Sequence, residues 1–486
     1  MVMTTGVPTV LVRESSAIGM ELIRLLPSAP ARLLLLSGQT DSHSAQLEAL
    51  GYEVSGFSCI SRQRLAQLAT ATRQAIYQVD LPLPEADVAS FDGAVVVDLS
   101  AHVHPLALWD QMARWLATDA VVVLAGLLSE RSPPRMQNWF KYVGAIGARC
   151  GFVEQYLVGS KEGVLGVFRK TTTPRWDVRH VRPIDFAEIA TLFQEVFGHP
   201  LSRDLWNWKY ANGHGNGVVA ARNGAVIAHY GGMYRDVILC GEPDWVFQIC
   251  DVMVHPQERG VMTRQGPFLL TAATSAEIYG PLGFGFPNAR AMLVAAKMGL
   301  YSEVGQMAEV RWGPAARRAR LRTRVKALER GSAMSQSLVE TLWAEMAQDL
   351  RHGVVGVRNW AYLEQRYFSH PHNHYELVVV TSRFTGKPLG VLVLRRLDAS
   401  CELLDVIAPL ANLTTLLDQA RRLTALWNLP NLYCWITKNY LPIFLVCDGK
   451  GEAINVTIPT SCWTGDPRAE VFKDKWWLMS GDTDFR

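Results

Sequence analysis

The first 170 residues alternate short apolar runs with helical stretches, and this alternation restricts the fold more than any other feature of the chain. Apolar runs that we expect to be strands lie at residues 33–36, 52–57, 94–98 and 120–125, with helices between them at 40–50, 62–73 and 105–117. Such alternation is typical of a parallel sheet covered by helices on both faces. Two later runs, 151–157 and 163–168, are close enough to form an antiparallel hairpin.

The rest of the 486-residue chain divides at changes of composition. A polar, proline-containing stretch near residue 174 marks the first boundary, and the second follows Trp312. The Ala/Arg-rich residues that follow indicate an exposed basic helix, with a solvated face favoured over an anion-binding one. Residues 336–486 repeat the pattern of 178–312 more weakly, which indicates an internal duplication. The predicted units are residues 1–170, 176–312, 313–335 and 336–486.

Composition excludes several classes of protein. Hydrophobic residues make up 49% and charged residues 19%, which is a packed globular composition. A net charge of +3 gives no reason to expect a nucleic-acid partner. No apolar run approaches the ~20 residues of a membrane span, and the first residues have no signal-peptide pattern. The eight cysteines lack paired spacing, so free thiols and a soluble cytoplasmic protein are expected.

Metal binding is not expected. His370, His372 and His374 alternate in one loop, but no further ligands can be identified for them.

Residues 33–58, together with 91–97 and 151–152, resemble a class I S-adenosylmethionine methyltransferase, which implies a Rossmann-like fold. The family's loop needs an acidic residue and three glycines, because glycine lets the backbone approach the cofactor. Here Leu35 stands at the acidic position, and Ser37, Gln39 and Asp41 stand at the glycine positions. The resemblance therefore implies a fold that does not bind S-adenosylmethionine. It would be kept for packing, for a protein partner or for a second copy of the chain.

The strongest functional pattern lies at residues 249–299. A strand at 249–254 leads through a turn into a helix at 263–278. Backbone N–H groups at a helix start form an anion site. Arg259 adds charge there, and Thr263 can cap the helix. A second short strand follows at residues 282–288, and a helix at 289–298 ends at Gly299.

This arrangement resembles the GNAT acyltransferases. The turn from Val254 to Gly260 matches the family's coenzyme A pyrophosphate loop, and Asn288 matches the end of the next strand. The resemblance implies tandem GNAT folds after the Rossmann-like region, with acetyl-CoA or another acyl-CoA as co-substrate. It departs at Met262, where a small residue is usual, and at Ala295, where many members carry Tyr. The implied cofactor-binding residues are Met253, Val254, Gln257, Glu258, Arg259, Gly260, Val261, Met262, Thr263 and Asn288.

Acyl transfer to an amine needs a base, a polarised carbonyl and a proton for the leaving thiolate. Asp251, on the strand before the loop, is the favoured base, with a structural hydrogen-bonding role as the alternative. Tyr301 is the candidate proton donor, with a core aromatic as the alternative. His255 adjoins Pro256, which favours a turn role. A backbone N–H near Met253 or Val254 would hold the carbonyl.

The predicted function is transfer of an acyl group from acyl-CoA to an amino sugar or another small-molecule amine, with hydroxyl acceptors as an alternative. Residues 206–210, Trp477 and residues 481–484 resemble a GNAT subgroup that has two tandem lobes, and this resemblance implies a bacterial enzyme of polysaccharide or natural-product biosynthesis. The second lobe carries Asp405 where the first carries Asp251 but lacks the Arg-Gly turn, so we expect it to shape the acceptor pocket. The competing hypothesis is a non-catalytic assembly or binding protein, which Ala295 and the altered N-terminal loop favour.

Overall fold

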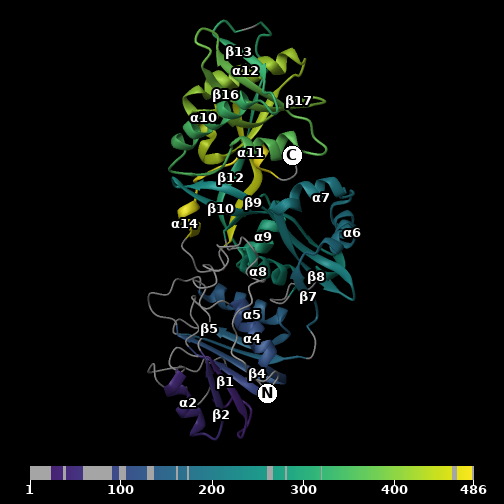
Figure 1. Cartoon of the computed structure of the whole chain (residues 1–486), viewed down its shortest axis with the longest axis vertical. Helices are drawn as coiled ribbons and strands as arrows, with labels where there is room; N and C mark the ends of the chain where they lie inside the picture. Colours follow the sequence, from purple (N-terminus) through teal and green to yellow (C-terminus); the bar gives the residue numbers. More distant parts are fainter. Residues whose placement is uncertain are drawn as a thin grey trace.

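The computed structural model describes residues 23–36, 40–57, 90–97, 105–127, 136–159, 163–171, 174–259, 266–279, 282–318, 320–461 and 468–483. These residues form three sheets that follow one another along an elongated molecule (Figure 1). We call them the N-terminal, middle and C-terminal sheets. The middle sheet lies between the other two, with helices α6 to α9 around it (Figure 1).

The N-terminal sheet has the predicted parallel strands and the predicted hairpin. Its order is β2 (Glu53–Phe57), β1 (Arg32–Leu36), β3 (Phe91–Val96), β4 (Leu116–Leu127), β6 (Gly163–Lys170) and β5 (Phe152–Gly159). Strands β1 to β4 are parallel, and β6 runs antiparallel to both of its neighbours.

The helices of this region include α2 (Thr40–Glu48), α4 (Pro105–Trp115) and α5 (Met136–Arg149). Alternate residues of β1 belong to two separate apolar clusters, so both faces of the sheet are covered. The helix expected at residues 62–73 lies outside the described residues.

The middle sheet is built around the long strand β9 (Ala225–Leu239). Five strands follow the order β11 (Gly283–Gly285), β10 (Glu242–Val254), β9, β14 (Val354–Gly356) and β20 (Trp476–Trp477). Two further strands form a branch, in which β8 (Gly215–Arg222) pairs with β9 and β7 (Asp177–His180) pairs with β8. The helices are α6 (Phe186–Phe197), α7 (Arg203–Tyr210), α8 (Pro267–Tyr279) and α9 (Ala289–Lys297). Gly299 follows α9 with φ 75°, the left-handed conformation expected of a glycine that ends a helix.

Helices α6 and α8 lie on opposite faces of the middle sheet. On β8, Val219 belongs to the apolar cluster of α6, whereas Val218 and Ala220 belong to the cluster of α8. Successive residues of a strand point to opposite faces. The sheet is therefore covered on both sides at the level of β8.

The C-terminal sheet has the order β13 (Thr323–Ala327), β15 (Glu376–Ser382), β16 (Pro388–Leu397), β17 (Ser400–Ile407), β18 (Leu432–Thr437), β12 (Tyr301–Trp312) and β19 (Lys450–Ser461). Helices α10 (Ala333–Asp349), α12 (Leu413–Leu426) and the short α11 (Trp360–Leu363) accompany it. The segment η5 (Glu364–Phe368) continues α11, and η8 (Ser480–Asp482) lies near the end of the chain.

Strand pairing crosses the boundary predicted at Trp312. Strand β12 precedes that boundary but pairs with β18 and β19 of the C-terminal sheet. Strands β14 and β20 follow it but join the middle sheet. The two halves of the chain thus exchange strands, which a boundary drawn from composition cannot reveal.

The helix predicted within residues 313–335 is wrong for most of its length. Residues 323–327 form β13, which pairs with β15 at the edge of the sheet, and α10 begins only at Ala333. Within β13, the basic residues Arg324 and Lys326 alternate with Thr323 and Val325, and this is the period of a strand. Helix-favouring composition concealed that period. Basic side chains also suit an edge strand, because they oppose pairing with another chain.

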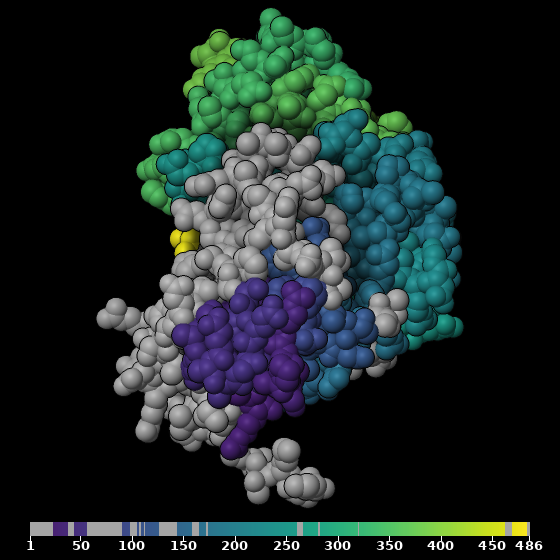
Figure 2. Space-filling model, turned by 60° about the horizontal axis from the view of Figure 1, so that its bottom comes forward, coloured from purple at the N-terminus to yellow at the C-terminus, as the bar shows by residue number. Residues whose placement is uncertain are grey.

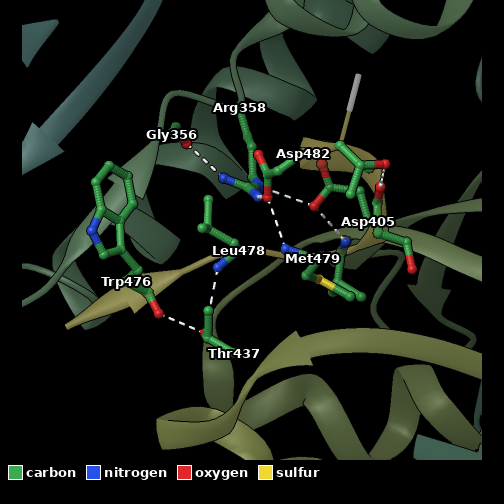
Figure 3. Close-up of polar contacts among 12 residues, drawn as sticks. Gly356, Arg358, Asp405, Thr437, Trp476, Leu478, Met479 and Asp482 are labelled. Atoms are coloured by element: carbon green, nitrogen blue, oxygen red, sulfur yellow. Dashed lines mark hydrogen bonds and ion pairs between the residues drawn. The ribbon is translucent and has the colours of Figure 1, made fainter. Parts of the chain in front are cut away.

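The C-terminal residues join the middle and C-terminal sheets through buried charges. Arg358 donates to Asp405 on β17 at 2.8 Å and to Asp482 at 2.5 Å, and it lies between the two carboxylates (Figure 3). Arg235 of β9 donates to the other oxygen of Asp482 at 3.1 Å. Arg358, Asp405 and Asp482 are at most 1% exposed. Because buried charges are tolerated only when paired, this network sets how the two sheets meet.

Candidate active site

The site begins with a β-bulge near the end of β10. The ladder with β9 runs to Cys250 and resumes at Met253, so Asp251 and Val252 lie outside it. Asp251 has φ 49°, in the left-handed region. On the other edge, β10 pairs with β11 as far as Ile249. The two parallel strands then separate, and the bulge re-aims the side chain of Asp251.

A cavity of about 450 Å³ occupies the separation of β10 and β11. Its mostly apolar wall comes from α6, α7, β10, β11, α8, α9 and β12. The lining residues used below are Phe193, Phe197, His199, Leu205, Lys209, Asp251, Val252, Phe268, Asn288 and Tyr301. Since α6 and α8 cover opposite faces of the sheet, the cavity connects the two faces through the gap between the strands.

A buried ion pair stands in the wall of this cavity. Lys209 of α7 donates to both carboxylate oxygens of Asp251, at 2.9 and 3.1 Å, and the Tyr210 hydroxyl donates to the same group at 2.7 Å. Burial favours a raised pKa for Asp251, but the charge and hydrogen bonds of Lys209 outweigh burial, and the pKa lies below its ordinary value. Asp251 is therefore ionised at neutral pH.

His229 and Tyr210 complete the surroundings of Asp251. The Nδ1 atom of His229 lies 2.7 Å from the Asp251 carbonyl oxygen, and burial lowers the pKa of the imidazole. The His229 ring is therefore neutral, and its Nδ1–H donates to that carbonyl. Burial, followed by the charge of Asp251, raises the pKa of Tyr210. The carboxylate is thus held by a cation and a hydroxyl, and its geometry is rigid.

Tyr301, the expected proton donor, lines the same cavity as Asp251. Its hydroxyl forms a hydrogen bond with that of Tyr230. Burial raises the pKa of Tyr301, so the hydroxyl keeps its proton at neutral pH and can donate it in a hydrogen bond. Ala295, where the resemblance expects Tyr, is fully buried in the core.

The residues predicted to bind coenzyme A do not all lie in the cavity wall. The side chain of Met253 packs in the α6 cluster, and the Arg259 guanidinium donates to the Val254 carbonyl at 2.9 Å. Asn288 lines the cavity and caps α9 by accepting from Ala291 N at 2.9 Å. Gly260, Val261, Met262 and Thr263 lie outside the described residues.

The turn after β10 is anchored from the α6 side. The buried carboxylate of Glu258 pairs with Arg222 at 2.5 Å, and His255 lies 3.0 Å from Glu195 of α6. The Gln257 backbone N–H donates to His255 Nδ1 at 3.3 Å, which agrees with the turn role expected for this histidine. These contacts fix the end of β10 from which the predicted loop starts.

The sequence did not reveal that Lys209 belongs to the site. Residues 206–210 form an aromatic stretch with one basic residue, but Lys209 and Asp251 are 42 positions apart in the chain. A lysine within an aromatic run is the available signal, because such a lysine is buried only with a partner. Here its side chain is 4% exposed.

The loop that carries His370, His372 and His374 contacts helix α7 and the residue that caps it. Among the residues with described structure, no group of three or more His, Cys, Asp or Glu is placed to hold a metal ion. The Nε2 atom of His372 forms a hydrogen bond of 2.6 Å with the Ser202 hydroxyl. The ring centroid of His370 lies 4.6 Å from that of Trp208. No helix in the described part of the chain is long and apolar enough to cross a membrane.

Residues 177–266, which include β7 to β10, match the family model described as "Acetyltransferase (GNAT) domain". The bulged strand and the turn after it lie within this match. This part of the chain is similar to a GNAT acetyltransferase domain, and the similarity supports an acyltransferase.

Solved structures with partial similarity include a probable N-acyltransferase from Enterococcus faecalis, at 12% identity and a TM-score of 0.46, covering 59% of this chain and 73% of that one. A GCN5-related N-acetyltransferase from Kribbella flavida has 14% identity and a TM-score of 0.43, covering 58% and 71%. N-myristoyltransferase from Saccharomyces cerevisiae has 10% identity and a TM-score of 0.41, covering 60% and 80%. No curated protein matches the chain.

Proposed function

We propose that the protein transfers an acyl group, in the first place acetyl, from acyl-CoA to a small-molecule amine. The observation that carries the proposal is the cavity that connects the two faces of the middle sheet at the bulge of β10. Two substrates can then approach from opposite faces and meet between the separated strands. Holding both reactants in one geometry is itself a large part of catalysis.

The donor approaches from the side of α8 in this proposal. The turn after β10 and the start of α8 would bind the pyrophosphate through backbone N–H groups and Arg259. Met253, Val254, Gln257, Glu258, Gly260, Val261, Met262, Thr263 and Asn288 belong to the same proposed binding segment. Backbone N–H groups at the bulge would hold the thioester carbonyl, since Asp251 and Val252 lie outside the ladder with β9.

The amine nitrogen attacks the thioester carbon, the carbon–sulfur bond breaks, and the sulfur leaves as a thiolate. Asp251 orients the amine and accepts its proton directly or through a water. Tyr301 donates a proton to the thiolate. The lowered pKa of Asp251 makes it a weak base, so its larger contribution is to stabilise the positive charge that forms on the attacking nitrogen.

We also propose that the flanking regions are degenerate copies of enzyme folds. The N-terminal order β2-β1-β3-β4-β6-β5, with β6 reversed, supports a methyltransferase-like region, and Leu35, Ser37, Gln39 and Asp41 argue against S-adenosylmethionine binding. A bulge near Asp405 on β17 supports a second GNAT-like lobe.

Isothermal titration calorimetry with acetyl-CoA tests the donor site. The wild-type protein should bind acetyl-CoA. Gly260→Val should lose tenfold or more in affinity, because a β-branched side chain blocks the backbone approach of the pyrophosphate. Gly313→Val is the matched control, since its Cβ would meet nothing within 4 Å.

Unchanged affinity in Gly260→Val would remove the loop from the proposal. Absence of acyl-CoA binding, and of thiol release with a panel of amines, would favour the alternative of a non-catalytic assembly or binding protein.

A further inference from the structure

The α6–α7 side of the cavity is lined by aromatic and aliphatic groups. Phe193 lies 4.7 Å from Phe197 and 5.2 Å from His199, ring centroid to centroid, and Leu205 is nearby in the same wall. We call Phe193, Phe197 and His199 the aromatic trio. Phe193 is 6% exposed and Phe197 is 45% exposed, so the trio extends from the core to the surface of the molecule. Ligand pockets are lined mainly by apolar and aromatic side chains, with a small number of polar groups.

The polar groups around the bulge already have partners within the protein, and in the trio the Nδ1 atom of His199 lies 3.5 Å from the Pro200 carbonyl oxygen. The Asp251 carboxylate is held by Lys209 and Tyr210, and Asn288 accepts from the first turn of α9. The Tyr301 hydroxyl forms a hydrogen bond with the Tyr230 hydroxyl. Among the described lining residues, Asp251 is the only acidic side chain, and it lies at the bulge rather than in the trio. The wall beyond the bulge therefore offers few partners to a ligand with many hydroxyl groups.

From this lining we infer that the acceptor is an amine on an apolar body, either aromatic or alkyl, and that the aromatic trio binds that body. The inference rests on the proposed acyl transfer. The amine would reach Asp251 at the bulge while its apolar part lies against Phe193, Phe197 and Leu205. An amino sugar would leave hydroxyls unpaired in this wall, at a cost of about tenfold in affinity for each.

The position of the trio assigns it to the acceptor rather than to the acyl chain. The donor enters from the α8 face, and the trio lies on the opposite face. An acyl chain long enough to reach Phe197 would pass the bulge and expose its end to solvent. An amine, in contrast, enters directly from solvent with the donor already bound.

The test compares amines at saturating acetyl-CoA. We expect kcat/KM for 2-phenylethylamine and hexylamine to exceed that for glucosamine by about 100-fold, since two or more hydroxyls would lose their partners. Phe197→Ala should raise KM for 2-phenylethylamine by about tenfold, with kcat and acetyl-CoA affinity unchanged. Phe384→Ala is the matched control, because Phe384 is 79% exposed in the turn between β15 and β16.

Several outcomes would overturn the inference, and they differ from failure of the proposed function. Glucosamine as the best acceptor, or a Phe197→Ala variant with normal KM, would overturn the apolar acceptor and leave acyl transfer in place. If octanoyl-CoA binds more tightly than acetyl-CoA and loses that advantage in Phe197→Ala, the trio belongs to the acyl chain. If no acyl-CoA binds at all, the proposed function fails as well.

Discussion

Lys209 and Asp251 are both buried, and the Lys209 nitrogen lies 2.9 Å from an Asp251 carboxylate oxygen. This arrangement changes how a base at Asp251 must be tested. Replacing Asp251 alone leaves a buried ammonium group without its counter-charge, and that loss alters the fold and the chemistry together. A loss of turnover in a single variant would then say little about proton transfer.

A double variant separates the two effects. Asp251→Asn should lower the free energy of unfolding by about 3–5 kcal/mol, because Lys209 stays buried and unpaired. Lys209→Met combined with Asp251→Leu should recover much of that loss, since no charge remains to be buried. Urea denaturation measures the free energy of unfolding of the single and the double variant. If the recovered double variant still turns over about 10²-fold more slowly, the Lys209–Asp251 pair acts in catalysis. Equal loss of stability in the single and double variants would contradict the interpretation of the pair.

The pH dependence of the pair has a defined sign. The folded pKa of Asp251 lies below the ordinary value of 3.8, so the folded state binds fewer protons than the unfolded state near that pH. The pair stabilises the fold fully above the unfolded pKa, and the contribution is lost as pH falls through the folded pKa. In the same denaturation series, wild type should therefore lose stability relative to the double variant only below about pH 4.

At the scale of elements, β10 of the middle sheet and β17 of the C-terminal sheet both have a β-bulge, but their surroundings differ. Strands β17 and β18 pair at only two positions, Cys401 with Leu432 and Glu402 with Tyr433. The C-terminal residues then lie between them: Trp435 N donates to Ser480 Oγ at 3.0 Å, and Thr437 N donates to Leu478 O at 3.1 Å. Beside β10, the separation of the strands forms a cavity. Beside β17, the corresponding separation is filled by the C-terminal residues. The bulge of β17 is therefore covered by the C-terminal segment of the chain.

Close packing around Gly481 makes this segment sensitive to substitution. A Cβ at Gly481 would lie 2.1 Å from the Tyr367 hydroxyl and 3.0 Å from the Leu404 carbonyl oxygen. Gly481→Ala should therefore lower stability by about 1–3 kcal/mol through overpacking, measured as a fall in melting temperature. Gly313→Ala provides the control, because nothing lies within 4 Å of its added Cβ. A similar change in both variants would mean that the segment moves aside freely.

At the scale of the whole molecule, the N-terminal region supports the acyltransferase domain. Helix α8 is buried along nearly all of its length, and side chains of α4, α5 and α8 share one apolar cluster. Because its buried residues lie on every side of the helix, neighbouring elements must cover every side of α8. The middle sheet covers one side of α8, and the N-terminal region covers another. Figure 2 views the molecule from this end, with the N-terminal residues in purple and blue against the teal middle region.

Removal of residues 1–173 should expose the apolar surface of α8. We expect the shortened chain to bind a hydrophobic dye, to aggregate, and to lose affinity for acetyl-CoA, because α8 starts at the proposed pyrophosphate site. Dye fluorescence, light scattering and calorimetry would measure these changes. A shortened chain that stays monomeric with full acetyl-CoA affinity would show that the N-terminal region has another role.

Features set by neighbours in sequence could be predicted from the sequence. The alternation of strands and helices before residue 170, the strand that leads into the turn at His255, and the glycine that ends α9 all depend on local periodicity and backbone preference. The period-two basic residues of β13 were also present in the sequence, and composition led to the wrong interpretation of them.

Tertiary structure alone decided which distant elements meet. The exchange of β12, β14 and β20 between sheets depends on strand partners, and hydrogen bonding between strands leaves no local pattern in either strand. Lys209 reaches Asp251 across 42 positions, and Arg235 reaches Asp482 across 247. These pairs are stable because burial removes water and makes an unpaired charge costly, and burial exists only once the sheets have packed. The cavity, its ion pair and its aromatic wall therefore became visible only in the folded molecule.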